Sequence, residues 1–179
     1  MSGNHIRPWS KIRDRLEHEY LAESLRGRLT YFATTYHAAH DGDEGRVAVR
    51  LDGCEILKSN YYDRFGFTWS AYAARQAEGM PSDEAWRQAP YDVMDSGEFY
   101  QMDFYRAFSE YDSQSIAESL QSQNAVVRMF ALLDRRTGKR TLEALRIPMR
   151  SQPEWLQMIY YLRLEAEGLP LQIEPTEGA

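Results

Sequence analysis

The pair Asp52-Gly53 constrains the fold of this chain more than any other feature. It separates two short segments with apolar centres, 47–51 and 54–60, and an Asp-Gly pair in that setting favours a two-residue type I′ turn. Both central residues of such a turn need positive φ, which glycine adopts readily and aspartate tolerates. We therefore predict two antiparallel strands joined at residues 52 and 53.

Residues 28–37 predict a third strand, because they are dense in the Thr, Tyr and Phe residues that suit a pleated surface. Three antiparallel strands in a meander follow from this arrangement. Before them, apolar residues recur at helical spacing at Trp9, Ile12, Leu16 and Tyr20. We expect this first helix to reach about Arg26 and to end at Gly27 in the left-handed conformation.

The segment 61–95 is rich in aromatic residues and has weaker secondary-structure signals. We expect Thr68 to cap a helix that runs to about Glu78. A short helix should then start at Ser82 and be limited by Pro90.

Helical signals return after this segment. Asp95 with Glu98 indicates the start of one helix, Asn124 caps another, and Ser151 with Glu154 forms a capping box for the last. The outline is an α+β domain, with an N-terminal helix, a three-stranded antiparallel meander and a helical C-terminal half.

The 179 residues suit one domain, and 43% hydrophobic residues exclude wholesale disorder. Within a single domain 1–179 we distinguish the helix and meander at about 9–60, a variable aromatic segment at about 61–95, a helical part at about 96–168 and an acidic tail at 171–179. No apolar run approaches the roughly 20 residues that span a bilayer, and no apolar signal core follows Met1. We expect a cytoplasmic protein without membrane contact.

The formal net charge of -6 hides an uneven distribution of charge. Residues 65–124 hold three basic and ten acidic residues, whereas residues 125–150 hold seven basic and two acidic ones. Most of the bases are arginines, which form planar bidentate pairs with carboxylates or phosphates. The basic segment therefore has two candidate partners, which are the acidic segment of the same chain and an external anion.

Two stretches of the chain resemble a known family. The first begins Trp9-Ser10-Lys11 and continues through residues 25–36 to 52–56, and the second covers residues 115–120 and the motif L-D-R-R-T-G-K-R at 133–140. Together they are similar to a family of small, uncharacterised bacterial proteins with a W-S-K start and an L-D-R-R-x-G-K-R motif near the C-terminus. The resemblance implies no activity and no site residues.

The basic run 133–140 is the sharpest candidate site. Arg135, Arg136, Lys139 and Arg140 gather at a corner between two helices, where a helix start favours anions. A phosphate, nucleotide or nucleic-acid contact is one interpretation. We favour internal pairing, in which Asp134 pairs with Arg135 or Lys139 and the arginines reach the acidic helices at 95–118. Nucleic acid is disfavoured because the protein as a whole is acidic.

A weaker candidate is a metal site at the end of the first strand. His37, His40 and Asp41 have side chains that bind zinc or another divalent ion. The spacing fits many unrelated sequences, so we favour a solvated loop without a metal.

Catalytic motifs are absent from the sequence. There is no nucleophile elbow, phosphate-binding loop or dinucleotide-binding motif. The single cysteine, Cys54, follows the tight turn, and we expect a small buried thiol there. We predict no cofactor and, on balance, no enzymatic activity.

The aromatic segment offers a further candidate surface, formed by Tyr61, Tyr62, Phe65, Phe67 and Trp69. One interpretation is that these rings cover the meander as part of the core. The other is a surface for a protein partner or for self-association, because tyrosine and tryptophan are enriched at interface hot spots. The leading hypothesis is a non-enzymatic interaction module that uses this surface. The alternative is a nucleic-acid or nucleotide-phosphate binder that uses the basic corner.

Overall fold

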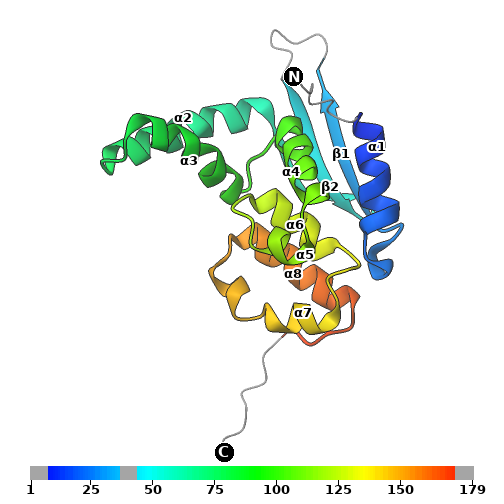
Figure 1. Cartoon of the computed structure of the whole chain (residues 1–179). Coiled ribbons are helices and arrows are strands. Elements are labelled where there is room, and N and C mark those ends of the chain that lie inside the picture. The colour runs from blue at the N-terminus through cyan, green and yellow to red at the C-terminus, as the bar shows by residue number, and fades with distance from the viewer. Residues whose placement is uncertain (1–7, 37–43, 172–179) are drawn as a thin grey trace, which may run out of the picture.

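The meander forms as predicted in the computed structural model, which describes residues 8–36 and 44–171 (Figure 1). Strands β1 (Leu29–Thr35), β2 (Gly45–Leu51) and β3 (Cys54–Asn60) form an antiparallel sheet in the order β1-β2-β3. Asp52 and Gly53 have φ of 50° and 83°, which confirms the predicted turn between β2 and β3.

Helices cover one face of this sheet (Figure 1). Helices α1 (Trp9–Asp14) and α4 (Gln101–Ser113) contact β1, and α4 also contacts β2. The strands contribute the following buried residues to the core against these helices: Leu29, Tyr31, Val47, Val49 and Leu57. On the other face, the guanidinium carbons of Arg46 and Arg50 lie 5.7 and 4.6 Å from the ring centre of Phe32.

The first helical segment ends earlier than predicted. After α1 the chain forms a π-helix, η1 (Arg15–Tyr20), and then leaves the helix at Leu21, so the predicted extension to Arg26 is wrong. The cause is tertiary, because Leu21 pairs with Asp134 in an isolated antiparallel bridge. A short 3-10 helix, η2 (Glu23–Leu25), follows, and Gly27 has the predicted positive φ of 73°.

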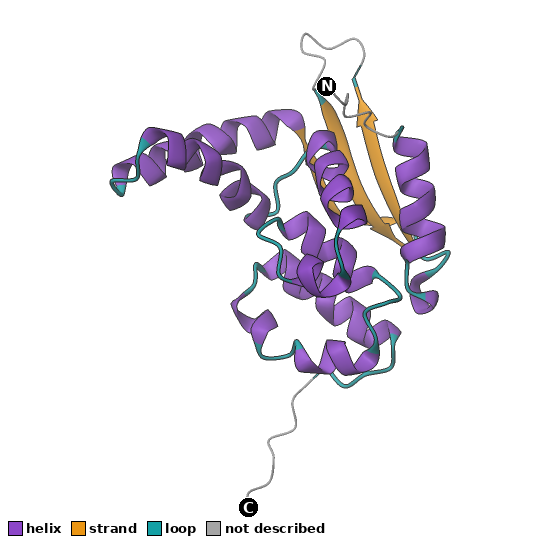
Figure 2. Cartoon of the chain, in the orientation of Figure 1, coloured by secondary structure: helices purple, strands orange, loops and turns teal. Residues whose placement is uncertain are grey.

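The C-terminal half is helical, as predicted. It contains α4, α5 (Ile116–Leu120), α6 (Ala125–Leu133), α7 (Lys139–Ala144), the 3-10 helix η3 (Pro148–Ser151) and α8 (Glu154–Ala166). Helix α6 is the centre of the core, since all of its residues except Arg128 are buried. The fold thus has two layers at the sheet and a bundle of short helices beside it (Figure 2).

Three predicted helix starts have different outcomes. Asn124 caps α6 by accepting a 3.0 Å hydrogen bond from the N–H of Val126, which confirms the prediction. The predicted start at Asp95 is wrong, because α3 (Ser82–Asp95) ends there. The capping box at Ser151 is also wrong, since the Ser151 hydroxyl donates to the carbonyl of Pro148 within η3.

The aromatic segment forms a helical hairpin that projects from the body of the protein (Figures 1 and 2). It consists of α2 (Tyr61–Ala77) and α3, and we call it the arm. Helix α2 begins directly after β3, because the side chain of Asn60 accepts hydrogen bonds from the first-turn N–H groups. The predicted cap at Thr68 is therefore wrong, and so is the limit at Pro90, which lies inside α3.

We expect Gly45→Ala to destabilise the fold, because a Cβ at this position would collide with the carbonyl of Thr34 and the side chain of Gln101. Overpacking of this kind costs about 1–3 kcal/mol in the free energy of unfolding, which urea denaturation measures. The control is Gly66→Ala on α2, where the added methyl group meets open space. That variant should gain about 0.5–1 kcal/mol, and a loss of stability there would contradict the exposure of α2.

Candidate functional site

The arm is fixed to the body by a buried ion pair between α2 and α4. Arg64 Nε lies 2.9 Å from one carboxylate oxygen of Asp103, and Arg64 Nη2 lies 3.2 Å from the other. Both side chains are buried, and the guanidinium also lies 5.4 Å above the ring of Tyr100. Asp103 further accepts the N–H of Tyr100 at the start of α4. One carboxylate thus begins α4 and holds the base of the arm.

A second ion pair joins the two helices of the arm. Arg75 donates two hydrogen bonds, of 2.8 and 2.9 Å, to the carboxylate of Asp92, and Gln88 donates a third of 3.1 Å. These hydrogen bonds from Arg75 hold the pKa of the Asp92 carboxyl below its usual value. The two helices of the arm are therefore joined by an ion pair whose members lie near the C-terminal end of each helix.

Aromatic rings form a continuous stripe along the arm. Tyr61, Phe65 and Trp69 lie one turn apart on α2, with ring centres 5.6 Å and then 6.4 Å apart. Trp69 and Tyr72 both contact Trp86 of α3, with ring centres 4.9 and 5.2 Å apart. The rings pack on one another, while Phe65, Trp69 and Trp86 keep about half of their surface exposed, at 49%, 50% and 46%.

All five predicted surface residues lie on α2, and two of them lie off the stripe. Tyr62 is exposed, and its hydroxyl donates a 2.7 Å hydrogen bond to Glu44. Phe67 is 49% exposed and has no ring contact within the described residues. Helix α2 buries only Arg64 and Thr68, so the aromatic segment does not form a core layer over the meander.

Sequence reasoning missed Trp86. The residue stands alone in a polar segment, so no periodic signal singles it out. It joins the stripe only because the hairpin places α3 beside α2. Together with Trp69, Tyr72, Ser82, Asp83 and Arg87 it lines an open hollow of about 580 Å³ near the tip of the arm.

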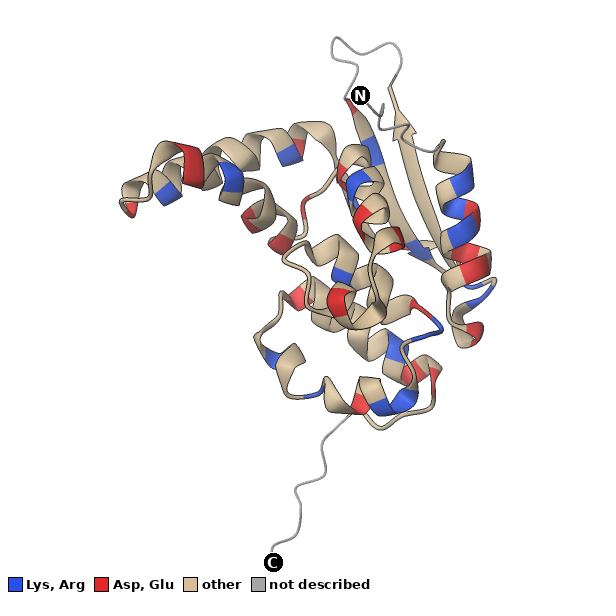
Figure 3. Cartoon of the chain, viewed as in Figure 1, with Lys and Arg blue, Asp and Glu red and all other residues tan. Residues whose placement is uncertain are grey.

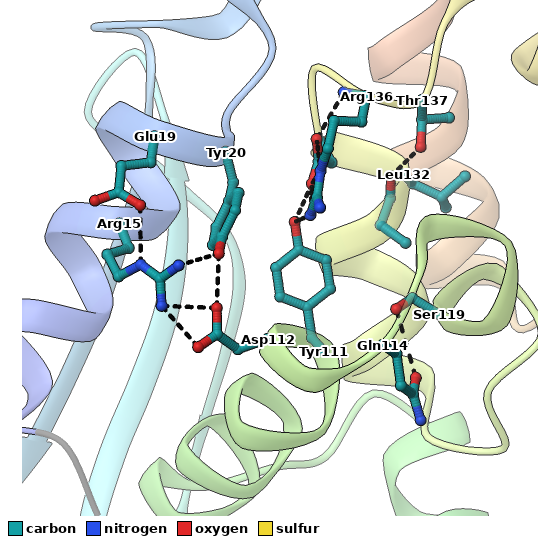
Figure 4. Close-up of polar contacts among 12 residues, drawn as sticks. Arg15, Glu19, Tyr20, Tyr111, Asp112, Gln114, Ser119, Leu132, Arg136 and Thr137 are labelled. Atoms are coloured by element: carbon teal, nitrogen blue, oxygen red, sulfur yellow. Dashed lines mark hydrogen bonds and ion pairs between the residues drawn. The ribbon is translucent and has the colours of Figure 1, made fainter.

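The basic corner after α6 contacts Tyr111 of α4 and Tyr20 of η1 through the side chain of Arg136 (Figure 4). The guanidinium of Arg136 donates hydrogen bonds of 2.7–3.2 Å to the carboxylate of Asp134, which is fully buried. The Tyr111 hydroxyl of α4 donates to the same carboxylate. Arg136 also lies over the ring of Tyr20, 4.8 Å from its centre. The hydrogen bonds to Asp134 raise the pKa of Arg136 above its usual value.

The four basic residues of the corner therefore have different environments. Asp134 pairs with Arg136, and not with Arg135 or Lys139, which the sequence analysis predicts as the partner of Asp134. Lys139 Nζ donates a 2.8 Å hydrogen bond to the carbonyl of Glu167. Arg135 and Arg140 are exposed, and neither side chain has an ion pair within the described part of the chain. Internal pairing thus accounts for two of the four.

A buried arginine that sequence reasoning missed reinforces this corner. Arg163 of α8 donates to three carbonyl groups at the end of α6 and in the next turn, those of Leu132, Asp134 and Thr137. Burial lowers the pKa of its guanidinium, and the nearby Glu167 opposes this shift. The carbonyl groups left open at the end of α6 are thereby satisfied by a side chain from another helix.

Comparison with known proteins adds a family. The model of the SF0329 protein family matches residues 8–164. The chain belongs to the SF0329 protein family. The match runs from the first helix through the meander and the arm to α8, so it includes the sheet, the arm and the helical C-terminal half. The comparisons found no match to this SF0329 member among curated proteins or solved structures.

The structure also bears on the predicted metal site, the cysteine thiol and the absence of a membrane span. His37, His40 and Asp41 lie outside the described residues, and within residues 8–36 and 44–171 no group of three or more metal-binding side chains occurs. Cys54 is exposed, so the predicted buried thiol is wrong; the residue pairs with Leu51 directly beside the turn of the β2–β3 hairpin. None of the described helices is long and apolar enough to cross a bilayer.

We expect Asp134→Ala to lower the free energy of unfolding by about 2–4 kcal/mol, because the buried hydroxyl of Tyr111 and the guanidinium of Arg136 lose their acceptor. Urea denaturation measures the change. Arg135→Gln and Arg140→Gln are the controls, since each removes one charge from an exposed side chain and should change stability by less than about 0.5 kcal/mol. Equal losses in all three variants would contradict the pairing of Arg136 with Asp134.

We expect Asp103→Asn to release the arm, because it leaves the buried Arg64 without a counter-charge. Breaking a buried pair in this way costs about 3–5 kcal/mol, and amide hydrogen exchange in α2 and α3 should become faster. Asp92→Asn is the matched control, since its partly exposed pair contributes about 1 kcal/mol or less. Unchanged exchange of the arm in Asp103→Asn would show that another contact holds it.

Proposed function

We propose that this SF0329 protein is a non-enzymatic interaction module, which binds a protein partner or a second copy of itself through the aromatic stripe of the arm. The observation that supports the proposal most is the exposure of α2. This helix has 17 residues and buries two of them, both polar. A helix that keeps its aromatic side chains outside the core presents an exposed apolar patch, and such patches mark interaction sites.

The exposed rings of the stripe leave a large apolar area in contact with solvent. The stripe residues Phe65, Trp69 and Trp86 are each about half exposed, so they leave roughly 300 Å² of ring surface open, which would contribute about 8 kcal/mol if buried. Association itself costs about 4–15 kcal/mol. The rings therefore bring binding close to balance, and the charged groups around them decide its strength and its partner.

The anion-binding alternative has weaker support. Arg136 and Lys139 already bond to groups of the fold, and α7 has only six residues, so it presents a short helix start. Arg135 and Arg140 alone would remain to bind a phosphate, and two exposed arginines are an ordinary surface feature. The geometry at this corner supports a structural role better than a binding role.

Site-specific photo-crosslinking in cells tests the interaction module. A photoreactive phenylalanine analogue at Phe65 should give one dominant protein adduct, because this ring belongs to the stripe and is 49% exposed. The matched control is the same analogue at Tyr161 of α8, which is 42% exposed and lies outside the arm. Mass spectrometry of the adduct distinguishes a partner from a second copy. An arm without an adduct, or equal adducts at both positions, would overturn the proposal.

A further inference from the structure

We infer that the tip of the arm binds a basic, extended segment of another protein, with an arginine or lysine side chain of that segment placed over the exposed faces of Trp69 and Trp86. This inference rests on the proposed function and assigns the chemistry of the ligand. It follows from the charges around the rings and from the geometry of the rings themselves.

Acidic residues outnumber basic ones on the arm, and Figure 3 marks both along its ribbon. Two of its three arginines are already used within the protein, since Arg64 pairs with Asp103 and Arg75 pairs with Asp92 and Glu78. Asp83 and Glu84 are exposed at the start of α3, and neither has an ion pair within residues 8–36 and 44–171. Asp83 lines the hollow beside Trp86.

The ring geometry suits a cation. Trp69 and Trp86 lie with their ring centres 4.9 Å apart and their planes at 54°, and each ring is about half exposed. Tyr72 stands almost perpendicular to both, at 87° and 84°. The rings fill the space between them, so a ligand lies over their outer faces. Indole faces attract arginine and lysine more strongly than other aromatic side chains do.

Among the described residues that line this hollow, Arg87 is the one basic residue. The Arg87 side chain is exposed, and its Nε donates to the backbone carbonyl of Asp83. Arg87 therefore does not pair with the Asp83 carboxylate. Its positive charge repels a cationic ligand at the hollow. Removing Arg87 should strengthen binding, whereas removing the neighbouring carboxylates should weaken it.

The same charges disfavour two other ligands. A symmetric contact between two arms centred on the hollow would place Asp83 and Glu84 against their own copies, and like charges at an interface are costly. Single-stranded nucleic acid stacks on aromatic rings, but it also requires basic residues along its phosphates. A basic protein segment satisfies both the rings and the carboxylates.

The test is a titration of the full chain with three 12-residue peptides, followed by the indole N–H signals of its four tryptophans in NMR spectra. The peptides carry four arginines, four lysines or four glutamines among glycine and serine, and a (dT)12 oligonucleotide is added as a fourth ligand. We expect the two basic peptides to shift the signals of Trp69 and Trp86. The position of the Trp155 signal should not change, since this indole donates to the carbonyls of Met94 and Asp95.

Four variants make the test specific. Trp86→Ala should weaken binding about tenfold, and Asp83→Asn with Glu84→Gln should weaken it about threefold and reduce its salt dependence. Arg87→Gln should strengthen binding about threefold. Tyr161→Ser on α8 is the control and should leave binding unchanged. The double carboxamide variant keeps all rings in place, so it reports on charge even if Trp86→Ala disturbs the hairpin.

The outcomes separate this inference from the proposed function. Binding of the glutamine peptide or of the oligonucleotide at the same strength, or shifts confined to Trp9 and Trp155, would overturn the basic ligand. If neither basic peptide binds while the analogue at Phe65 still crosslinks to a partner, the interaction module stands and the ligand chemistry is wrong. If light scattering shows a dimer that Trp86→Ala dissociates, the arm binds a second copy and the inference fails.

Discussion

The turn at Leu133 and Asp134 is the junction on which the rest of the structure depends. The backbone there pairs with Leu21 and ends the first helical segment, and its carbonyl groups receive Arg163 from α8. The buried Asp134 carboxylate receives the Tyr111 hydroxyl from α4 and the guanidinium of Arg136. A buried carboxylate is costly unless its partners satisfy it, and here those partners come from segments far apart in the chain. This requirement fixes how the helices meet.

The same principle explains why the arm can stand away from the body. Its base is held by Arg64 and Asp103, a second buried pair whose geometry cannot be kept unless α2 and α4 stay together. Beyond that anchor, the arm is stabilised by its own contacts, which are the pair of Arg75 with Asp92 and the ring stack. The aromatic side chains gain contact with one another without leaving the surface. The protein thus presents an ordered aromatic surface with acidic groups at its tip.

The basic corner and the aromatic segment could be found from the sequence, but their environments could not. The sequence predicts internal pairing at the corner, and Arg136 does pair internally. Its carboxylate partner is Asp134, two residues earlier, and it also reaches α4 through the hydroxyl of Tyr111. Tyr111 and Tyr20 complete the site through contacts that no spacing in the sequence reveals. In the arm, Trp86 was missed for the same reason, because its stripe is formed by two helices and each contributes only part of it.

The sequence by itself determined the features that depend only on neighbouring residues. Asp52-Gly53 specifies a turn because it supplies two positive φ angles, alternating strands follow from it, and Asn124 caps α6 through its own nearest N–H groups. Tertiary structure alone decided the features that depend on distant groups. Leu21 leaves its helix to pair with Asp134, Pro90 is tolerated inside α3, and α2 begins at Tyr61 and leaves its rings outside the core. A backbone hydrogen bond or a buried ion pair can outweigh local propensity, and its partner is set only when the chain has folded.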